Sequence, residues 1–418
     1  MRVLIVNTSE QKGGAAIAAS RLMHALRAEG VEARMLVRDT DHPSALVHRV
    51  HGHWKGRLRF LWERVVIWAA NRFTRRNLFK VSIANTGFDI TRLPEFQEAD
   101  VVHLHWINQG FLSLRDLRKI LLSGKRVVWT LHDMWPATAI CHHAYACEAY
   151  HVACHDCPFL AAPGRNDLSA RVFRQKQRTY GGLHPNLSVV AVSRWLAERV
   201  KESALLGEKP RDIIPNTLSL DNFDLLDRTE SRRELGLADR RYILLFGAAR
   251  IDDPIKGFEF LRAAIECLLQ RGEYRREELH LLLFGQIKDE HLLDDFPISH
   301  TEMGVVRDTH LISRLYSAAN VTVSTSHYET FGQTMVEAQA CGCLPLSFDG
   351  SGQADIIEHK ENGYLAARLD IENLTDGLEW CLGDGQCIDR RDLREGVLQR
   401  YAPSAIAQKY IEVYTRQQ

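Results

Sequence analysis

Short apolar runs that alternate with helical segments, in two separate series, constrain the fold of this chain most strongly. The first series begins with RVLIVN at residues 2–7 and continues through ADVVHLHW, KRVVWTLHD and LSVVAVS. The second starts at residue 242 with YILLFGAAR and continues through LHLLLFG, NVTVSTS and CLPLSF. Strands that alternate with helices build parallel sheets through right-handed crossovers. The sequence therefore predicts an α/β protein with two Rossmann-like domains.

A boundary between these domains is predicted near IIPNTLSLDNF, where Pro-Asn closes the first series. We expect an N-terminal domain over residues 1–216, a C-terminal domain over 217–400 and a final helix over 401–418. A chain of 418 residues is long enough for two domains of typical size. Neither series contains G-x-G-x-x-G, which argues against a dinucleotide-dependent oxidoreductase.

The balance of charge excludes a broad attraction to polyanions. Lys plus Arg and Asp plus Glu both total 53, so the formal net charge is zero. We expect no nucleic-acid partner, and any attraction to an anionic membrane must be local. The start of the chain, MRVLIVNTSE, has too short an apolar run for a signal peptide or a membrane span, which favours a cytoplasmic protein.

Two glycine-containing turns follow strands where parallel α/β sheets bind ligands. The crevice of such sheets lies at the carboxyl ends of the strands, where helix N-termini point unpaired N–H groups outward. A small residue there lets the backbone approach an anion closely. The candidates are Gly13 and Gly14 in the first series, and Phe331, Gly332, Gln333 and Thr334 in the second. A plain turn is the alternative for Gly13-Gly14.

Charged residues at the same end of the second series suit a diphosphate joined to a sugar. Arg250 and Lys256 would stabilise the charge that develops on a leaving diphosphate. Glu329 follows the strand VTVSTS, and Glu337 is expected about two turns into the next helix. Eight helical residues correspond to about 80° of rotation and about 12 Å of rise. We therefore expect the two carboxylates to hold different parts of one extended ligand, Glu337 a ribose and Glu329 the transferred sugar.

These motifs together resemble the donor site of the family 4 retaining glycosyltransferases of the GT-B fold. The pattern is R-x5-KG at residues 250–257 with E-x7-E at residues 329–337, and the segments AVSRWL, IIPN and LYSAANVTVSTS support it. The resemblance implies two Rossmann-like domains that face a central cleft. It also implies that the helix over residues 401–418 crosses back to the first domain. Asn320 and Thr217 stand where the family usually has Asp and Gly.

The resemblance assigns roles to individual residues. His132, in WTLHD, resembles the family histidine that contacts the donor sugar and the transition state. The expected catalytic residues are His132, Arg250, Lys256 and Glu329. The expected donor-binding residues are Gly13, Gly14, Arg250, Lys256, Phe331, Gly332, Gln333, Thr334 and Glu337.

The implied reaction moves a sugar from a UDP- or GDP-sugar to a hydroxyl of a growing glycan, with retention of configuration. No catalytic metal is expected, because a helix N-terminus, Arg250 and Lys256 supply the positive charge. The sequence shows no nucleophile with a paired base, which favours a front-face mechanism in which the leaving phosphate accepts the hydroxyl proton. His103 and His105 alternate along VVHLHW, so we expect them on one face, lining the crevice.

Two other classes of function stay open. One is a sugar-nucleotide epimerase or glycan phosphorylase of the same fold, against which the E-x7-E motif argues. The other is a catalytically silent glycan-binding or assembly protein that keeps the fold. The intact charged residues of the donor motif argue against the second class.

Four cysteines between residues 141 and 158 form a second group of interest. Cys141, Cys147, Cys154 and Cys157 end in C-x2-C, a pattern that suits a closed, structural zinc site. Free thiols or disulfides are the alternatives, and nearby histidines could substitute as ligands: His142, His143, His151 and His155. A similar Cys-rich insertion occurs in exopolysaccharide-assembling members of the family. That resemblance favours a role in cell-surface polysaccharide biosynthesis.

Residues 54–80 combine basic and aromatic side chains. Eight Lys or Arg stand against a single Glu, interleaved with tryptophan and phenylalanine, which predicts a basic amphipathic helix. If the acceptor is lipid-linked, we expect this helix to lie on the inner face of a membrane. The alternative is that the aromatic residues pack on the first sheet while the arginines are solvated.

Overall fold

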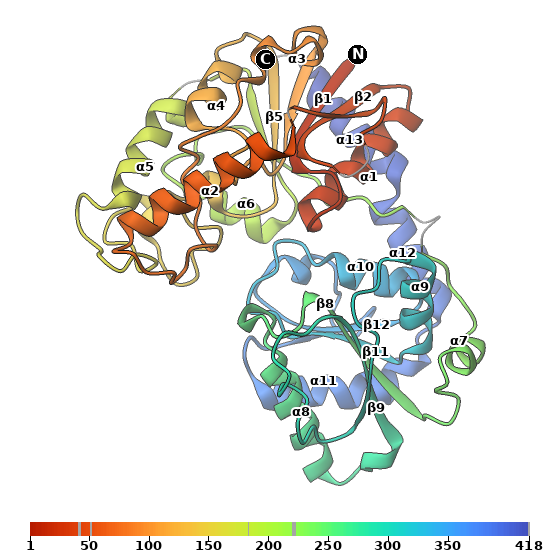
Figure 1. The fold of residues 1–418 in the computed structure, drawn as a ribbon. Helices are drawn as coiled ribbons and strands as arrows, with labels where there is room; N and C mark the ends of the chain where they lie inside the picture. Colours follow the sequence, from red (N-terminus) through yellow and green to blue (C-terminus); the bar gives the residue numbers. More distant parts are fainter. Residues whose placement is uncertain (41–42, 51, 183, 220–222, 417–418) are drawn as a thin grey trace. The chain divides into compact units, whose positions relative to one another are not determined.

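The computed structural model describes residues 1–40, 43–50, 52–182, 184–219 and 223–416. The chain forms two compact units. The first contains Met1–Thr217 and Ile406–Gln418, and the second contains Leu218–Ala405. Each unit is a parallel sheet covered by helices (Figure 1), which confirms the predicted α/β architecture with two Rossmann-like domains.

The sheet of the first unit has seven parallel strands in the order β3-β2-β1-β4-β5-β6-β7. The strands are β1 (Arg2–Ser9), β2 (Glu32–Asp39), β3 (Val47–Arg49), β4 (Val101–Leu104), β5 (Arg126–Leu131), β6 (Leu187–Ala191) and β7 (Arg211–Ile213). Its α-helices are α1 (Gly14–Ala28), α2 (His53–Ala70), α3 (Pro94–Glu98), α4 (Leu114–Leu121), α5 (Leu168–Lys176), α6 (Arg194–Lys201) and most of α13 (Pro403–Thr415). Strand order changes direction between β1 and β4, which is where such sheets bind ligands.

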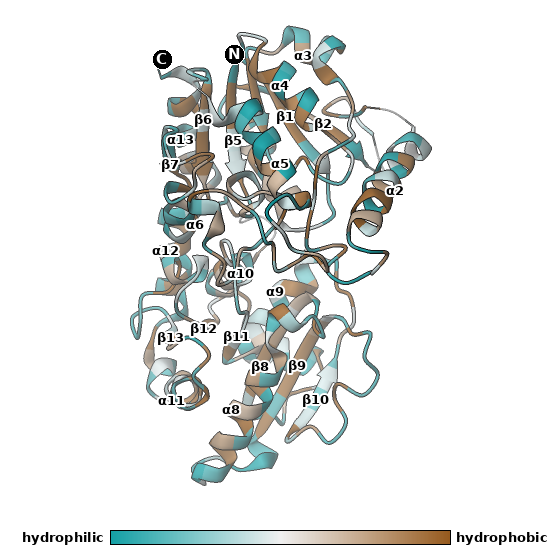
Figure 2. Cartoon of the chain, turned by 90° about the vertical axis from the view of Figure 1, so that its left-hand side faces the viewer, coloured by the Kyte–Doolittle hydropathy of each residue, from teal (hydrophilic) through white to brown (hydrophobic). Residues whose placement is uncertain are grey.

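The sheet of the second unit has six parallel strands in the order β10-β9-β8-β11-β12-β13. The strands are β8 (Tyr242–Arg250), β9 (Leu279–Gln286), β10 (Ser299–Glu302), β11 (Val321–Ser324), β12 (Leu344–Phe348) and β13 (Tyr364–Ala366). The helices are α7 (Arg228–Glu234), α8 (Phe258–Arg271), α9 (Thr309–Ala318), α10 (Gln333–Ala340), α11 (Ile371–Leu382) and α12 (Arg390–Tyr401). The central strands are apolar along most of their length because helices cover the sheet (Figure 2).

The last helix, α13, belongs to the core of the first unit. Ile406, Ala407 and Val413 are buried in one cluster with side chains of β1, β2 and α1. Tyr414 and Tyr410 add buried polar contacts, because their hydroxyls bond to His103 Nδ1 at 2.6 Å and to Thr130 Oγ1 at 2.9 Å. The end of the chain is therefore packed against the sheet with which the chain begins.

The helix predicted over residues 54–80 is shorter than expected. It spans His53–Ala70, and the chain continues in turns because Arg72, Phe73 and Asn77 adopt left-handed backbone conformations. The alternative that the aromatic residues pack on the first sheet is wrong for Trp54 and Trp62, which are 63% and 58% exposed. No helix in the described part of the chain is long and apolar enough to cross a bilayer.

Truncation of a buried side chain tests the packing of α13. Ile406 is fully buried, so Ile406→Ala should lower the free energy of unfolding by about 2–5 kcal/mol through the cavity it creates. Leu398 on α12 is partly exposed, and Leu398→Ala should cost no more than about 1 kcal/mol. Urea unfolding of both variants makes the comparison. Equal losses would contradict the packing described for α13.

Candidate active site

Lys256 and Glu329, 73 residues apart in sequence, meet in the second unit. Lys256 Nζ donates a hydrogen bond to Glu329 Oε1 at 2.5 Å, and Ser326 Oγ donates to the same oxygen at 2.9 Å. Lys256 ends a short 3-10 turn after β8, and Glu329 lies in the loop between β11 and α10. The structure therefore brings together two of the predicted catalytic residues.

Gly257 is required for this contact. Thr325 Oγ1 donates to the carbonyl oxygens of Lys256 and Gly257 at 3.0 and 2.7 Å. The φ of Gly257 is 62°, and a Cβ atom there would lie 2.3 Å from the Thr325 carbonyl oxygen. Any side chain at this position would push the two loops apart. The K-G pair of the sequence motif is explained by this close approach.

The other predicted cation, Arg250, ends β8 and is partly exposed. Its Nε donates to Asp252 Oδ1 at 3.1 Å. Burial would raise the pKa of Asp252, but the hydrogen bond from Arg250 and one from the backbone hold that pKa below its usual value. Arg250 is thus oriented by a charged neighbour two residues away. The described residues show it in no ion pair with Glu329.

The N-terminus of α10 forms the third part of the donor motif. Its N-cap, Gly332, has a φ of 102° and offers no side-chain cap. The Met335 N–H bonds to the Gly332 carbonyl oxygen, so the N–H groups of Gln333 and Thr334 are the ones suited to another acceptor. Gln333 Nε2 is buried without a hydrogen-bond partner in the described part of the chain. Phe331 and Thr334 flank this turn, with Phe331 packed against Tyr401. Backbone donors and one amide are available to an anion here.

Glu337 lies closer to the helix start than predicted. Helix α10 begins at Gln333, so Glu337 is about one turn into it rather than two. Glu329 precedes the helix, and the predicted separation of 80° and 12 Å therefore does not describe the pair. Glu337 is half-buried, as is Glu329. The two carboxylates still lie on either side of the helix N-terminus along the chain.

The first unit has an open cavity of about 430 Å³ at the carboxyl ends of β1, β2 and β5. Gly13 and Gly14 line it at the start of α1, where Gly13 has a φ of 95° and leaves the helix without a side-chain cap. His132, Asp133 and His143 line it from the β5 side. The predicted glycine turn and the predicted catalytic histidine thus share one cavity.

His132 is electrically neutral near pH 7. Burial lowers its pKa to about 4, and its Nε2 shares a hydrogen bond of 2.9 Å with His105 Nδ1. Burial also holds the pKa of His105 well below its usual value. A neutral imidazole can hydrogen-bond to an uncharged hydroxyl without adding a positive charge to the cavity.

The expectation that His103 and His105 line the crevice is wrong. They lie on one face as predicted, with ring centroids 4.3 Å apart, but both are almost fully buried. Neither lines the cavity that contains His132. His103 bonds to Thr130 and to Tyr414. β4 lies in the middle of the sheet and is covered by α13, so both histidines serve the packing behind His132.

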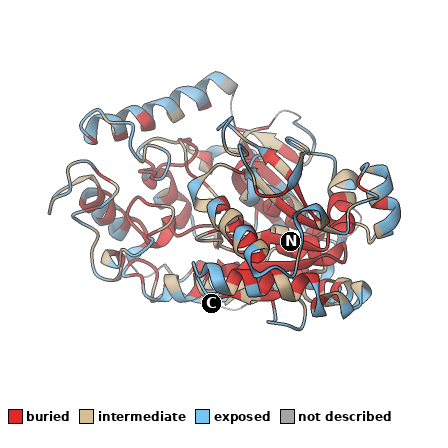
Figure 3. Ribbon diagram, turned by 90° about the horizontal axis from the view of Figure 1, so that it is seen from below, coloured by how far each residue is buried: buried red, intermediate tan, exposed pale blue. Residues whose placement is uncertain are grey.

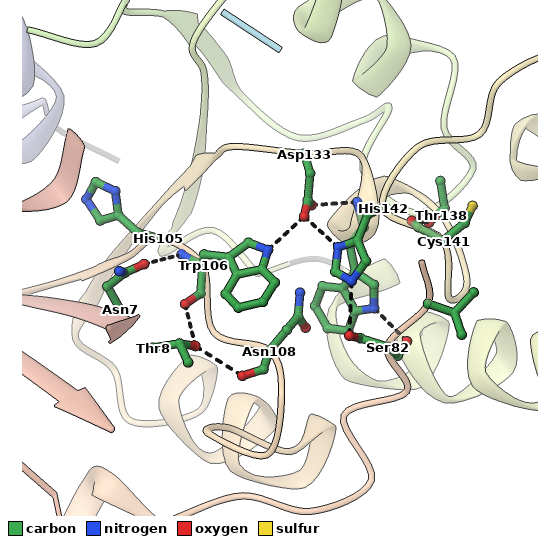
Figure 4. Close-up of polar contacts among 12 residues, drawn as sticks. Asn7, Thr8, Ser82, His105, Trp106, Asn108, Asp133, Thr138, Cys141 and His142 are labelled. Atoms are coloured by element: carbon green, nitrogen blue, oxygen red, sulfur yellow. Dashed lines mark hydrogen bonds and ion pairs between the residues drawn. The ribbon is translucent and has the colours of Figure 1, made fainter. Parts of the chain in front are cut away.

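Asp133 organises a polar network that the sequence did not predict (Figure 4). Its Oδ2 accepts hydrogen bonds from Trp106 Nε1 at 2.7 Å and His142 Nδ1 at 2.6 Å, and His142 Nε2 contacts Ser82 Oγ at 3.0 Å. Burial would raise the pKa of Asp133, but His142 and the Trp106 N–H hold it at about 2. The only local signal was its position directly after His132.

Two family descriptions match successive parts of the chain. Residues 12–222 match Glycosyltransferase Family 4, and residues 227–399 match Glycosyl transferases group 1. This chain belongs to the family 4, group 1 glycosyltransferases. A D-inositol 3-phosphate glycosyltransferase of Geodermatophilus obscurus is 29% identical over 319 residues, covering 72% of this chain and 62% of the relative. An uncharacterized glycosyltransferase of Methanocaldococcus jannaschii is 24% identical, covering 81% of this chain and 90% of the relative.

Solved structures share the fold of this chain. Sucrose-phosphate synthase from Thermosynechococcus elongatus superposes with a TM-score of 0.66 at 20% identity and covers 99% of this chain and 98% of its own. HepE of Anabaena, solved with UDP and glucose, gives a TM-score of 0.61 at 16% identity, with 99% of each chain covered. At these identities the likeness establishes the GT-B fold alone.

The four cysteines of the predicted zinc site line one small cavity of the first unit. Burial raises the pKa of Cys154 to about 12 and that of Cys157 to about 11, and neighbouring thiols add to both shifts. All nine cysteines are free thiols. Among the described residues, no three His, Cys, Asp or Glu side chains are arranged to hold a metal ion. Zinc therefore stays a prediction that rests on the donor set.

The neighbouring histidines have other partners. His142 is held between Asp133 and Ser82, His151 pairs with Glu202, and His155 pairs with Asp156. His143 lines the cavity that contains His132. These contacts favour an all-cysteine site over one completed by histidine.

Metal analysis of protein purified under reducing conditions tests the zinc prediction. We expect one zinc per chain, and Cys154→Ser should lower the thermal midpoint far more than Cys267→Ser, a change at a partly exposed thiol of the second unit. The reason is that a thiolate zinc site contributes roughly 10–16 kcal/mol of apparent binding energy. Zinc-free protein with an unchanged midpoint in both variants would exclude the site.

Proposed function

We propose that this glycosyltransferase moves a sugar from a UDP- or GDP-sugar to a hydroxyl of a lipid-linked glycan in cell-surface polysaccharide assembly, with retention of configuration. The observation that carries the proposal is the Lys256–Glu329 ion pair beside the uncapped N-terminus of α10. A cation, a carboxylate and backbone N–H groups together suit a diphosphate joined to a sugar. HepE, a structural neighbour, has been solved with UDP-glucose.

The ion pair defines what donor binding must change. Lys256 Nζ forms an ion pair with Glu329. An incoming diphosphate offers Lys256 a more highly charged partner, while the sugar hydroxyls offer Glu329 new hydrogen-bond donors. The diphosphate of the donor therefore binds Lys256 and the sugar of the donor binds Glu329, so neither side chain is left without a partner. Arg250 and the N-terminus of α10 supply further positive charge around the diphosphate, so no catalytic metal is needed.

The same groups support a front-face reaction. As the anomeric bond breaks, charge grows on the leaving diphosphate, and Lys256 and Arg250 stabilise it. The leaving phosphate oxygen accepts the proton of the incoming hydroxyl, which then forms the new glycosidic bond on the same face. Glu337 holds the ribose, and neutral His132 bonds to a hydroxyl of the donor sugar. The neutral state of His132 suits a hydrogen-bonding role better than that of a general base.

A catalytically silent glycan-binding protein is the principal alternative. It would keep the fold and bind a glycan without turning over a donor. Slow hydrolysis of a nucleotide sugar by the purified protein separates the two, since only an enzyme cleaves the anomeric bond. An epimerase or phosphorylase would be recognised by its product.

A panel of nucleotide sugars tests the proposal directly. We expect one UDP- or GDP-sugar to raise the thermal midpoint and to be consumed when a glycan acceptor is added. Nuclear magnetic resonance of the product should show the anomeric configuration of the donor. Inverted configuration, or no cleavage of any donor that binds, would refute the proposed reaction.

Substitution of the two carboxylates of the motif should affect different kinetic parameters. Glu337→Gln should chiefly weaken donor binding, because a ribose contact is the same in ground and transition states. Glu329→Gln and Lys256→Ala should chiefly lower kcat, because their contacts strengthen as the bond opens. A loss of about 10²–10³ is typical of one such contact. Calorimetric donor affinity and turnover are measured for each variant.

The matched control is Glu361→Gln, an exposed glutamate in a turn of the second unit. It should bind donor and turn over like the wild type. If Glu329→Gln also behaves like the wild type, the assignment of the donor site is wrong, even for an active glycosyltransferase.

A further inference from the structure

Helix α2 buries one ion pair against the protein. Glu63 and Arg64 are 0% and 5% exposed. Glu63 Oε1 accepts the backbone N–H groups of residues 83 and 84 at 2.8 and 2.9 Å. Arg64 donates to the carbonyl oxygens of Leu78 and Val81, and its Nη2 lies 3.2 Å from Glu63 Oε2. This buried pair joins α2 to the chain that follows it.

The opposite side of α2 is apolar and faces solvent (Figure 3). Its residues recur every three or four positions, which places them on one helical stripe. Each is between 37% and 63% exposed. The stripe consists of Trp54, Leu58, Leu61, Trp62, Val65 and Trp68. The inward side of α2 buries Ile67 beside the ion pair, whereas the outward side carries the stripe together with exposed Lys55 and Arg57.

The buried pair keeps the stripe outward. Rotating α2 to bury its tryptophans would withdraw Glu63 and Arg64 from the groups to which they bond. The backbone N–H groups of residues 83 and 84 would then lose their acceptor inside the protein, which is costly. The exposed stripe is therefore a stable feature of the first unit.

The exposed charges of residues 54–80, the segment that contains the stripe, are all of one sign. Six lysines and arginines between residues 54 and 80 are exposed, whereas Glu63, the only carboxylate in that segment, is buried. The six are Lys55, Arg57, Arg72, Arg75, Arg76 and Lys80. A second copy of this face would bring like charges together, which disfavours self-association. A surface with anionic headgroups and an apolar interior is complementary to both the cations and the apolar stripe.

We propose that α2 inserts its apolar stripe into the surface of an anionic lipid bilayer while the surrounding cations contact the headgroups. Tryptophan suits this position, because its ring is amphipathic and is enriched at membrane interfaces. The proposal goes beyond sugar transfer, since it rests on α2 alone and holds whatever the donor is. It also differs from attachment by charge alone, because apolar contacts persist when salt screens the charges.

Flotation of the full chain with vesicles tests the insertion. We expect binding to phosphatidylcholine vesicles that contain phosphatidylglycerol, weakened but not abolished by high salt. Trp62→Ser with Trp68→Ser should reduce binding at least about tenfold at either salt concentration, because each buried apolar side chain contributes strongly. The control, Val305→Ser, removes an equally exposed apolar side chain in the second unit and should float like the wild type.

A charge-reversal variant separates the two contributions. Arg72→Glu, Arg75→Glu and Arg76→Glu together should reduce low-salt binding to anionic vesicles about a hundredfold, since each basic residue near such a surface contributes substantially. Its binding at high salt should fall much less. Thermal shifts with the nucleotide sugar should be unchanged in both variants, which shows that they fold and that a failure here is separate from a failure of the proposed reaction.

Three results would overturn the proposal. The wild type could fail to float with anionic vesicles at low salt. The tryptophan variant could float as well as the wild type. Sedimentation could instead reveal a dimer that the tryptophan variant dissolves, in which case the stripe is an interface between copies of this chain.

Discussion

The candidate donor site depends on the parallel pairing of β8 with β11. In that register Val321 lies beside Leu244, so both strands end at the same edge of the sheet. The loop after each strand then emerges next to the other, and Thr325 fixes the two loops by binding the carbonyl oxygens of residues 256 and 257. The Lys256–Glu329 pair follows from this arrangement, as does the need for glycine beside the lysine.

In the first unit, burial determines the protonation state of the histidines. His132 lies at the edge of a cavity, but its partner His105 and the neighbouring His103 are enclosed between β4, β5 and α13. The low dielectric of that interior keeps the imidazoles neutral, and Tyr414 satisfies His103 from the last helix. In the proposed reaction the neutral histidine would contact a sugar hydroxyl, whereas Arg250 and Lys256 of the second unit would contact the diphosphate.

Interactions inside the protein also decide the character of the surface at α2. The buried ion pair of Glu63 with Arg64, together with buried Ile67, fixes which side of the helix meets the protein. The apolar stripe is exposed as a consequence, since the two sides of a helix cannot both face inward. Buried contacts therefore leave an apolar stripe exposed on a chain whose net charge is zero.

The sequence by itself determined the two parallel-sheet domains and the donor motif. Strand and helix periods are local properties, and residues such as Gly257 and Glu329 stand at fixed distances from strand ends. Tertiary structure alone decided the Asp133 network, the burial of His103 and His105, and the exposure of the apolar stripe on α2. Each of these depends on partners far along the chain, such as Trp106 for Asp133 or Tyr414 for His103. Periodicity shows that a helix has two unlike faces, but only the groups packed against it decide which face turns inward.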